Sequence, residues 1–103
     1  MSVVVKTLVS NSLKTKFRII CIKEEKTISK MVEELLEDLI QSEAEIPQDL
    51  DQSLDTPVVL KGYIPEELKR KFKVFCTVRK IPMNLALHYL ILKRVDMDNQ
   101  ELG

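Results

Sequence analysis

The sequence predicts a mainly α-helical fold with a small antiparallel β-ribbon, formed by two tandem strand–helix–helix units that pair within one chain. Three observations lead to this prediction. A segment of the chain repeats at a spacing of 55 residues, each copy opens with a β-branched run, and each continues with two apolar stripes at helical spacing. The chain has 103 residues, of which 45% are hydrophobic and 31% charged, enough apolar material for one modest core.

The repeat becomes visible when residues 3–38 are aligned with residues 58–93. Nine of the 36 aligned positions are identical, whereas average composition gives roughly two by chance. The identical pairs are Val3/Val58, Val4/Val59, Lys6/Lys61, Leu13/Leu68, Lys14/Lys69, Lys16/Lys71, Phe17/Phe72, Cys21/Cys76 and Leu35/Leu90. We therefore predict an internal duplication.

Charge is distributed unevenly along the chain, although the formal net charge is zero. Residues 58–95 carry nine lysines and arginines and two acids, whereas residues 43–57 carry five acids and no base. Basic blocks joined by acidic connectors are compatible with a polyanionic partner. The predicted organisation is unit 1 at residues 1–42, an acidic linker at 43–57, unit 2 at 58–95 and a polar tail at 96–103.

Each unit begins with a strand and a helix. β-branched residues dominate residues 3–9 and 58–64, which we predict to be strands. Ser10, a good N-cap, and Pro65, which suits a first helical turn, mark the helix starts that follow. Each first helix carries apolar residues at positions i, i+4, i+7 and i+8, which form one stripe.

A second apolar helix completes each unit. Thr27 is a good N-cap, and Pro82 cannot continue the preceding helix but fits the start of another. The side chains expected in the core are Leu13, Phe17, Ile20, Cys21, Ile28, Met31, Val32, Leu35, Leu36 and Leu39 in unit 1, and Leu68, Phe72, Phe75, Cys76, Met83, Ala86, Leu87, Leu90 and Ile91 in unit 2.

The two units are expected to pair, because a lone strand leaves its backbone groups unbonded and neither pair of stripes closes a core alone. This strand–helix–helix order resembles the ribbon-helix-helix family of DNA-binding regulators, which includes the Arc and methionine repressors. Residues 8–13 and 63–68 resemble the family's strand-to-helix junction, and residues 27–29 and 82–84 its second helix start. The resemblance implies a covalent version of the family's homodimer, with Cys76 where a small residue is usual.

Alternation along a strand places Val9 and Ile64, next to the first helices, toward the core. The opposite face then carries Val4, Lys6, Leu8, Val59, Lys61 and Tyr63. A two-stranded ribbon fits the major groove, and the resemblance implies that these side chains face base edges. Lys6 and Lys61 are the strongest candidates, since a lysine donates to guanine O6 and N7. The apolar members fit thymine methyls, but equally a ribbon that reads little or a surface for a partner protein.

The N-terminus of each second helix is expected to bind phosphate, because its free N–H groups and dipole favour anions. The candidates are Lys26, Thr27, Ser29 and Lys30 in unit 1, and Arg79, Lys80, Met83 and Asn84 in unit 2. Unit 2 is the more basic, so replacing Lys61 or Arg79 is expected to weaken DNA binding more than replacing Lys6 or Lys26. The basic residues of the first helices are expected to be solvated: Lys14, Lys16, Lys69, Arg70, Lys71 and Lys73.

Other function classes fit the sequence poorly. Two glycines do not make a phosphate-binding loop, and one histidine with two core-like cysteines argues against catalysis or a metal site. We therefore expect no enzymatic activity, no cofactor and no metal. The chain has no apolar run long enough to span a bilayer and no signal-peptide pattern, so a cytoplasmic location is expected, in a prokaryotic cell or in the host of a virus.

The sequence therefore predicts a sequence-specific transcriptional regulator, a repressor, that binds double-stranded DNA at an imperfect palindromic operator. Four apolar residues outside the core stripes are candidates for self-association on DNA: Ile22, Val78, Leu85 and Leu92. Two alternatives stay open. One is an antitoxin-like protein-interaction module, and the other is an accessory DNA-binding protein for plasmid or viral replication or partition.

Overall fold

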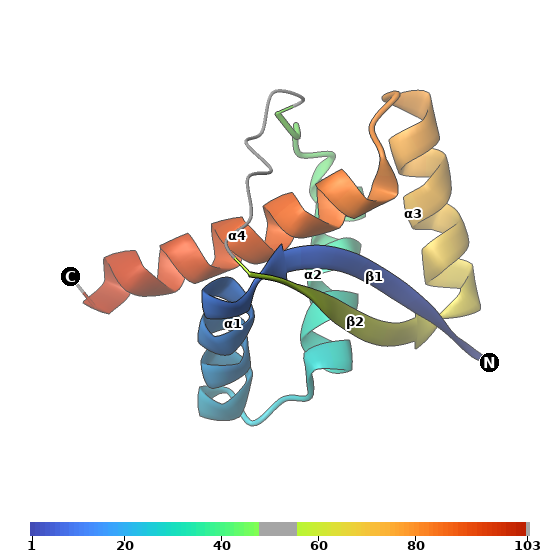
Figure 1. Ribbon diagram of the computed structural model, residues 1–103. Coiled ribbons are helices and arrows are strands. Elements are labelled where there is room, and N and C mark those ends of the chain that lie inside the picture. Colours follow the sequence, from blue (N-terminus) through green and yellow to red (C-terminus); the bar gives the residue numbers. More distant parts are fainter. Residues whose placement is uncertain (48–55, 103) are drawn as a thin grey trace.

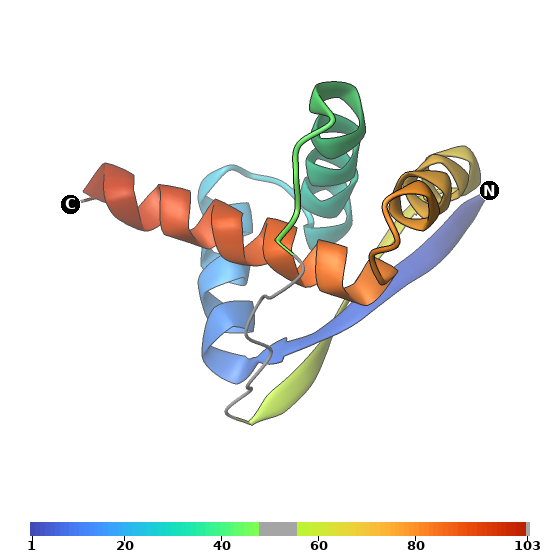
Figure 2. The ribbon, with the colours of Figure 1, turned by 90° about the horizontal axis from the view of Figure 1, so that it is seen from above.

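In the computed structural model of the protein, which describes residues 1–47 and 56–102, four helices cover one face of a two-stranded sheet. The elements are β1 (Ser2–Ser10), α1 (Asn11–Lys23), α2 (Ile28–Ser42), β2 (Pro57–Pro65), α3 (Glu66–Val78) and α4 (Met83–Leu102). Figure 1 shows the two strands side by side, with α1 and α3 near opposite ends of the ribbon. Figure 2 shows all four helices on the same side of the ribbon. The prediction of a mainly helical fold with a small antiparallel ribbon is confirmed.

The strands pair antiparallel over nine residues each, so that Lys6 lies opposite Lys61 at the centre of the ribbon. Each strand extends one residue beyond both ends of the predicted β-branched run. The side chains of Val9 and Ile64 are fully buried beneath the helices. Strand alternation was therefore predicted correctly, because a buried face and an open face fix the register of a strand.

Two serine and threonine caps begin the helices of the first half. Ser10 Oγ and Thr27 Oγ1 each accept a hydrogen bond from the backbone N–H three residues on (3.1 and 3.0 Å). Pro65 precedes α3 without a side-chain hydrogen bond, and Glu66 and Glu67 in the first turn of α3 suit the positive end of its dipole. The caps expected from the sequence therefore begin α1 and α2.

The turns between the two helices of each half have the same backbone geometry. In both turns an N–H group donates to the carbonyl of a buried cysteine five residues earlier, Cys21 in the first turn and Cys76 in the second (2.9 and 3.0 Å). Each turn also holds one residue in the left-handed region, Glu25 at φ 56° and Lys80 at φ 57°. The two turns are therefore alike in both hydrogen bonding and chain path.

The two strand-to-helix junctions are also alike. The N–H group of Asn11, the first residue of α1, donates to the carbonyl of Thr56, which precedes β2. In the same way the N–H group of Glu66, the first residue of α3, donates to the carbonyl of Met1, which precedes β1 (3.2 Å in both cases). Each helix start is thereby tied to the beginning of the other strand.

The apolar stripes meet in one core beneath the ribbon. Phe17 and Phe72, at aligned positions of α1 and α3, are its largest fully buried side chains. Nearly all of the predicted core residues are buried, and the half-buried members are Ile28, Leu35 and Met83. Ile46, in the first part of the expected linker, also enters the core. Residues 48–55 of that linker lie outside the described residues.

The helices contact the ribbon differently in the two halves. Gly62 of β2 faces α2 so closely that a Cβ atom there would lie 3.2 Å from Val32 Cβ. Thr7 occupies the aligned position of β1 and is buried, and its Oγ1 donates to the carbonyl of Asn84 at the start of α4 (2.9 Å). One half therefore relies on close approach and the other on a hydrogen bond.

α4 differs from its prediction in two respects. Residues 96–102, which the sequence marks as a polar tail, continue the helix to Leu102, and Asp98 pairs with Lys23 of α1 at 3.9 Å. The expectation that Leu85 is available for contacts between chains is wrong, because Leu85 is only 4% exposed. The start of α4 is buried on more than one side, so a single-stripe pattern underestimates its core.

No helix in the described ranges is long and apolar enough to cross a bilayer.

Candidate nucleic-acid interface

The face of the ribbon that points away from the helices carries all six predicted base-reading residues. They form three cross-strand pairs, Val4/Tyr63, Lys6/Lys61 and Leu8/Val59. Val4 is half-buried and the other five are exposed, with Leu8 at 52%. The open face therefore has two lysines at its centre and an apolar or aromatic pair on either side.

Two lysines of the first helices bond the outer edges of the ribbon. Lys69 Nζ of α3 donates to the Val4 carbonyl (3.0 Å), and Lys14 Nζ of α1 donates to the Val59 carbonyl (2.9 Å). The backbone groups of the outward-facing residues therefore point away from the partner strand. Such residues form the non-hydrogen-bonded pairs of an antiparallel ladder, in which side chains lie closest to one another. The lysines also occupy edge groups that another strand would otherwise bond.

Lys6 and Lys61 are thus two like charges placed directly opposite each other at the centre of the open face. Among residues 1–47 and 56–102, no carboxylate forms an ion pair with either lysine. Directly opposed like charges destabilise a sheet. A bound anion between the two ammonium groups would relieve such a repulsion.

Among the clefts of the described residues, two basic ones lie at opposite outer edges of the ribbon. The cleft at the β1 edge measures about 280 Å³, and that at the β2 edge about 540 Å³. The first is lined by Val4, Val5, Lys6, Lys69, Phe72, Met83, Asn84 and Leu87, and the second by Lys14, Arg18, Ile28, Val59, Leu60 and Lys61. Each cleft joins a strand lysine, a lysine of a first helix and the N-terminus of a second helix, a combination that suits an anion.

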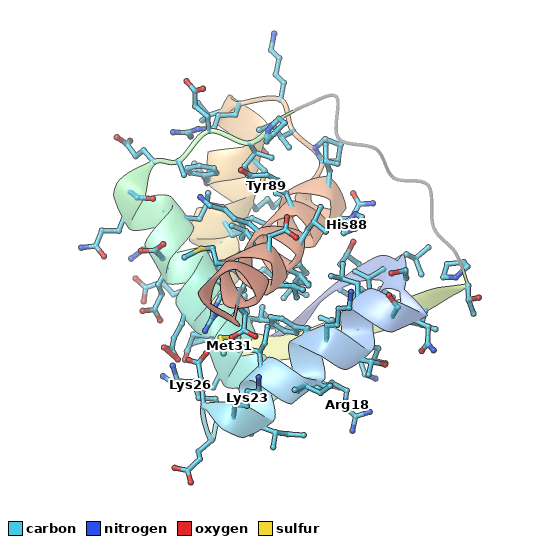
Figure 3. All side chains as sticks on the ribbon, turned by 90° about the vertical axis from the view of Figure 1, so that its left-hand side faces the viewer. Arg18, Lys23, Lys26, Met31, His88 and Tyr89 are labelled. Carbon is cyan, nitrogen blue, oxygen red and sulfur yellow. The ribbon has the colours of Figure 1, made fainter. Side chains whose placement is uncertain are left out.

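The clefts bring together residues that the sequence assigned to different tasks. Lys6, a base-reading candidate of β1, shares a cleft with Met83 and Asn84, phosphate-binding candidates at the start of α4. Arg18, which the sequence interpretation missed, lines the opposite cleft and lies on the outer surface of α1 (Figure 3). The prediction that Lys14 and Lys69 are only solvated is wrong, because each ammonium donates to a strand carbonyl. Their recurrence at aligned positions was a signal for this shared structural role.

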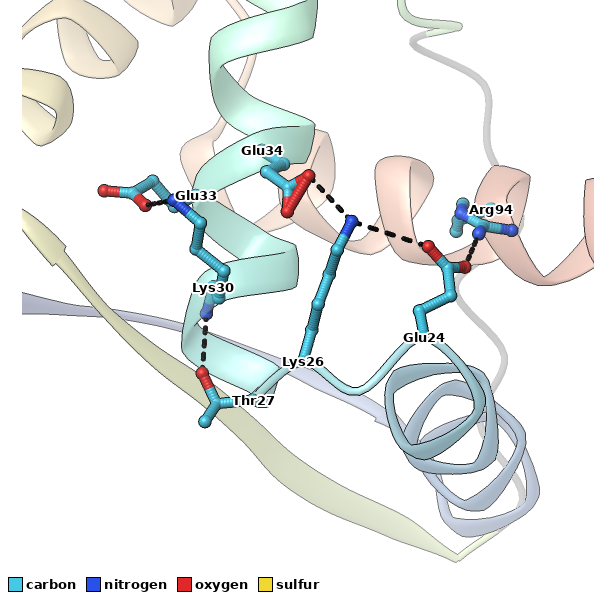
Figure 4. Close-up of polar contacts among 7 residues, drawn as sticks. All are labelled: Glu24, Lys26, Thr27, Lys30, Glu33, Glu34 and Arg94. Carbon is cyan, nitrogen blue, oxygen red and sulfur yellow. Dashed lines mark hydrogen bonds and ion pairs between the residues drawn. The ribbon is translucent and has the colours of Figure 1, made fainter.

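At the start of α2 the predicted phosphate-binding cations are engaged by carboxylates (Figure 4). Lys26 Nζ lies 2.9 Å from Glu34 Oε1 and 3.5 Å from Glu24 Oε1. Lys30 Nζ lies 3.0 Å from Glu33 Oε2, and this hydrogen bond raises the pKa of Lys30. Both cations are therefore neutralised within the protein.

The hydroxyl groups at the start of α2 are also engaged. Thr27 caps the helix, and Ser29 Oγ accepts a hydrogen bond from the backbone N–H of Tyr63 on the ribbon edge (2.8 Å). Ser29 thus links the start of α2 to β2. An anion at this end of α2 would meet the free N–H groups of the first turn rather than these hydroxyls.

The start of α4 presents its cations differently. The Arg79 guanidinium lies 3.6 Å from the centre of the Phe75 ring, and Nη1 lies 3.4 Å from the Phe75 carbonyl. Lys80 is exposed, and within the part of the chain that the structure describes it forms no ion pair. Lys80 is therefore a positive charge at this end of the molecule that no carboxylate of the described residues neutralises.

The buried titratable groups lie in the core rather than on this surface. Burial raises the pKa of the Cys21 thiol and raises that of Cys76 to about 11. Burial also lowers the pKa of His88 on α4. No group of three or more metal-ligating side chains is arranged to hold an ion in the described ranges.

Comparisons with known proteins find no matching family model, no matching curated protein and no matching solved structure.

Proposed function

We propose that the protein is a sequence-specific regulator that binds double-stranded DNA by inserting the β1–β2 ribbon into the major groove. The observation that carries this proposal is the pair of directly opposed lysines, Lys6 and Lys61, on the open face of the ribbon, where no carboxylate of the described residues pairs with them. A two-stranded ribbon fits the major groove, where lysine donates to guanine O6 and N7. Tyr63 supplies a hydroxyl group, and Leu8 and Val59 suit thymine methyls.

The two basic clefts support the same function. DNA phosphates fix the position of a protein on the duplex, and they are bound by lysine, arginine and helix N-termini. Such groups line the clefts on both sides of the ribbon, where the sugar–phosphate walls of a groove would lie. We assign Lys14, Arg18 and Lys69 to phosphate positioning in addition to the residues at the starts of α2 and α4.

We further propose that the two halves of the chain arose by duplication and act as an intrachain pseudo-dimer. The shared geometry of the two helix turns and of the two strand junctions supports this. So do the equivalent bonds of Lys14 and Lys69 to the opposite strand and the equivalent lining of the two clefts. This architecture is the covalent form of a ribbon-helix-helix dimer, the family that the sequence resembles.

A pseudo-symmetric reader fits an imperfect palindrome, because each half can prefer its own bases. Occupation of such an operator would repress transcription by excluding other proteins from the promoter. Ile22 and Val78, both more than two-thirds exposed at the ends of α1 and α3, remain candidates for contacts between molecules on DNA. An accessory role in plasmid or viral replication or partition would use the same surface.

One observation favours the second candidate function, an antitoxin-like protein-interaction module. Leu8 and Val59 form an exposed apolar pair next to the exposed ring of Tyr63. Apolar side chains on an open sheet face also suit a protein partner. In this reading the ribbon would face a protein rather than a groove.

Selection of bound duplexes from a random pool, followed by footprinting, tests the proposal. We expect enrichment of a site with two related half-sites, protected in the major groove. The doubly substituted Lys6→Gln/Lys61→Gln protein should lose the enrichment while keeping its circular-dichroism spectrum. Failure of the wild-type protein to enrich any sequence over bulk DNA would reject the proposal. Tight binding to a protein partner instead would establish the second candidate.

A further inference from the structure

The start of α2 holds its cations in a carboxylate network that connects three helices. Glu34 of α2 and Glu24, at the end of α1, both contact Lys26, and Glu24 also pairs with Arg94 of α4. Glu33 holds Lys30 separately (Figure 4). Lys26 precedes the N-cap of α2 and Lys30 lies in its first turn, and both are bound by the protein's own acids.

The aligned positions of the second half carry no such acids. Arg79, His88 and Tyr89 stand where the first half has Glu24, Glu33 and Glu34. Residues 23–34 contain three lysines and four glutamates, whereas residues 78–89 contain one arginine, one lysine and no acid. The two ends that should face phosphate are therefore electrostatically unlike.

We propose that Glu24, Glu33 and Glu34 act as an intramolecular competitor for DNA phosphate at the start of α2. This inference rests on the proposed DNA-binding function. The glutamates occupy Lys26 and Lys30 in the free protein, and a phosphate group must displace them before it gains these contacts. Residues 78–89, around the start of α4, contain no acid that could act as an equivalent competitor.

The pairs are placed so that they can open. The side chains of Lys26 and Glu34 are 32% and 39% exposed, and exposed pairs of this kind are weak. The closed arrangement also leaves Glu34 Oε2 buried without a hydrogen-bond partner, a cost that opening removes. A phosphate carries a full negative charge and several acceptor oxygens, so it can replace a carboxylate at a lysine ammonium.

The competitor has a consequence for the order of binding. Near the start of α4, Lys80 forms no ion pair among the described residues and can attract phosphate at first encounter, whereas the α2 end gains affinity only after its ion pairs open. The half-site under α4 should therefore contribute more to affinity, and mismatches there should weaken binding more. The glutamates would thus make a pseudo-symmetric protein bind its operator in one preferred orientation.

Isosteric Glu→Gln substitutions test the competitor. The probe is a fluorescent duplex of about 25 base pairs that carries the selected site and spans two half-sites. E33Q/E34Q should bind this duplex about three- to tenfold more tightly than the wild type in dilute salt, since each released pair is weak. Its affinity should also fall more steeply with salt, because additional ammonium groups reach phosphate.

Glu37→Gln/Asp38→Asn is the matched control. Glu37 and Asp38 are exposed on the same helix and neither makes an ion pair among the described residues, so E37Q/D38N removes the same two charges without breaking an ion pair of Lys26 or Lys30. We expect its affinity to rise by less than about twofold, because exposed charges that are not paired are screened. Equal gains from E37Q/D38N and E33Q/E34Q would overturn the competitor, since they would reflect net charge alone.

A double-mutant cycle separates competition from a structural role. Lys26→Met should cost less than about twofold in DNA affinity in the wild-type protein, where Glu34 holds the ammonium, but about fivefold in the E24Q/E34Q background. Equal costs in both backgrounds would contradict the inference. Thermal melts check that each variant is folded. If E34Q destabilises the protein, the gain in DNA affinity is measured instead with E33Q alone, which releases only the separate Lys30 pair. Absence of any DNA binding by the wild type would instead reject the proposed function.

Discussion

The opposed lysines at the centre of the ribbon should lower the stability of the fold and raise its affinity for DNA. Changing Lys6 to Gln removes one of two like charges, and changing it to Glu places opposite charges across from each other. We therefore expect the free energy of unfolding to increase in the order Lys, Gln, Glu at position 6. DNA affinity should fall in the same order.

The magnitude follows from the geometry of the pair. Non-hydrogen-bonded neighbours have Cβ atoms about 4.5–5.5 Å apart, and the exposed ammonium groups can separate to about 7–10 Å. At that distance two unit charges in water repel by about 0.4–0.6 kcal/mol before screening by salt. Removal of one charge should therefore raise Tm by about 2–4 °C for a domain of this size. Loss of one lysine–guanine contact should cost about 1–3 kcal/mol of binding free energy.

Two measurements check both halves of this prediction. Thermal melts in low salt and in 1 M NaCl should show the stability series in the first and a much smaller series in the second, because salt screens exposed charges. Titration of the selected duplex should show weaker binding and relaxed preference at one base pair of the site. Lys16→Gln is the control, since Lys16 is an exposed lysine on α1 that forms no ion pair among the described residues.

The charge argument makes a further demand on the double variant. Once Lys6→Gln has removed the repulsion, Lys61→Gln should add no further stability, because the two effects share one interaction. If the two gains add, or if Lys6→Gln lowers Tm in dilute salt, the repulsion at the ribbon centre is refuted. Unchanged DNA affinity in both single variants would refute the role of this pair in binding.

Three other perturbations have expected outcomes. Gly62→Ala should lower the free energy of unfolding by about 1–3 kcal/mol, because its Cβ would press on Val32; a melt at or above the wild-type Tm would refute this. Cys21 and Cys76 should resist a thiol reagent at pH 8 in the native state and react on unfolding, since burial raises both pKa values. Burial lowers the pKa of His88, so the unfolded state binds the proton more readily than the native state does. The free energy of unfolding should therefore fall as the pH drops below about 6.5, by at most about 1.4 kcal/mol per pH unit. Chemical denaturation between pH 7.5 and 5.5 should show this loss, and His88→Gln should reduce it.

The periodic spacing of apolar residues predicted the helices and strands, and it predicted which face of each strand is buried. Alternation along the β-branched runs placed Val9 and Ile64 inward and Lys6 and Lys61 outward, as the structure has them. Thr27 was correctly identified as an N-cap. These features depend on local spacing, which a single chain displays without knowledge of its tertiary contacts.

Features that depend on packing between elements could not be predicted from the sequence. The destinations of Lys14 and Lys69 lie on strands far away along the chain, and a long flexible side chain gives no periodic signal for such a contact. The neutralisation of Lys26 escaped for the same reason, because Glu34 reaches it from the next helix and Arg94 orients Glu24 from α4. Leu85 was misjudged because neighbours surround the start of α4.

The unequal contacts of Gly62 and Thr7 bear on how such a chain avoids pairing with the wrong half. On the proposed duplication, two first halves would press a threonine against α2, where even a Cβ lies 3.2 Å from Val32. Two second halves would leave the Asn84 carbonyl without its hydroxyl donor. Pairing of two identical halves is disfavoured in both combinations, so each half fits the other half better than it fits a copy of itself. Because the two halves are covalently joined, they are always made in a one-to-one ratio, whatever the level of gene expression.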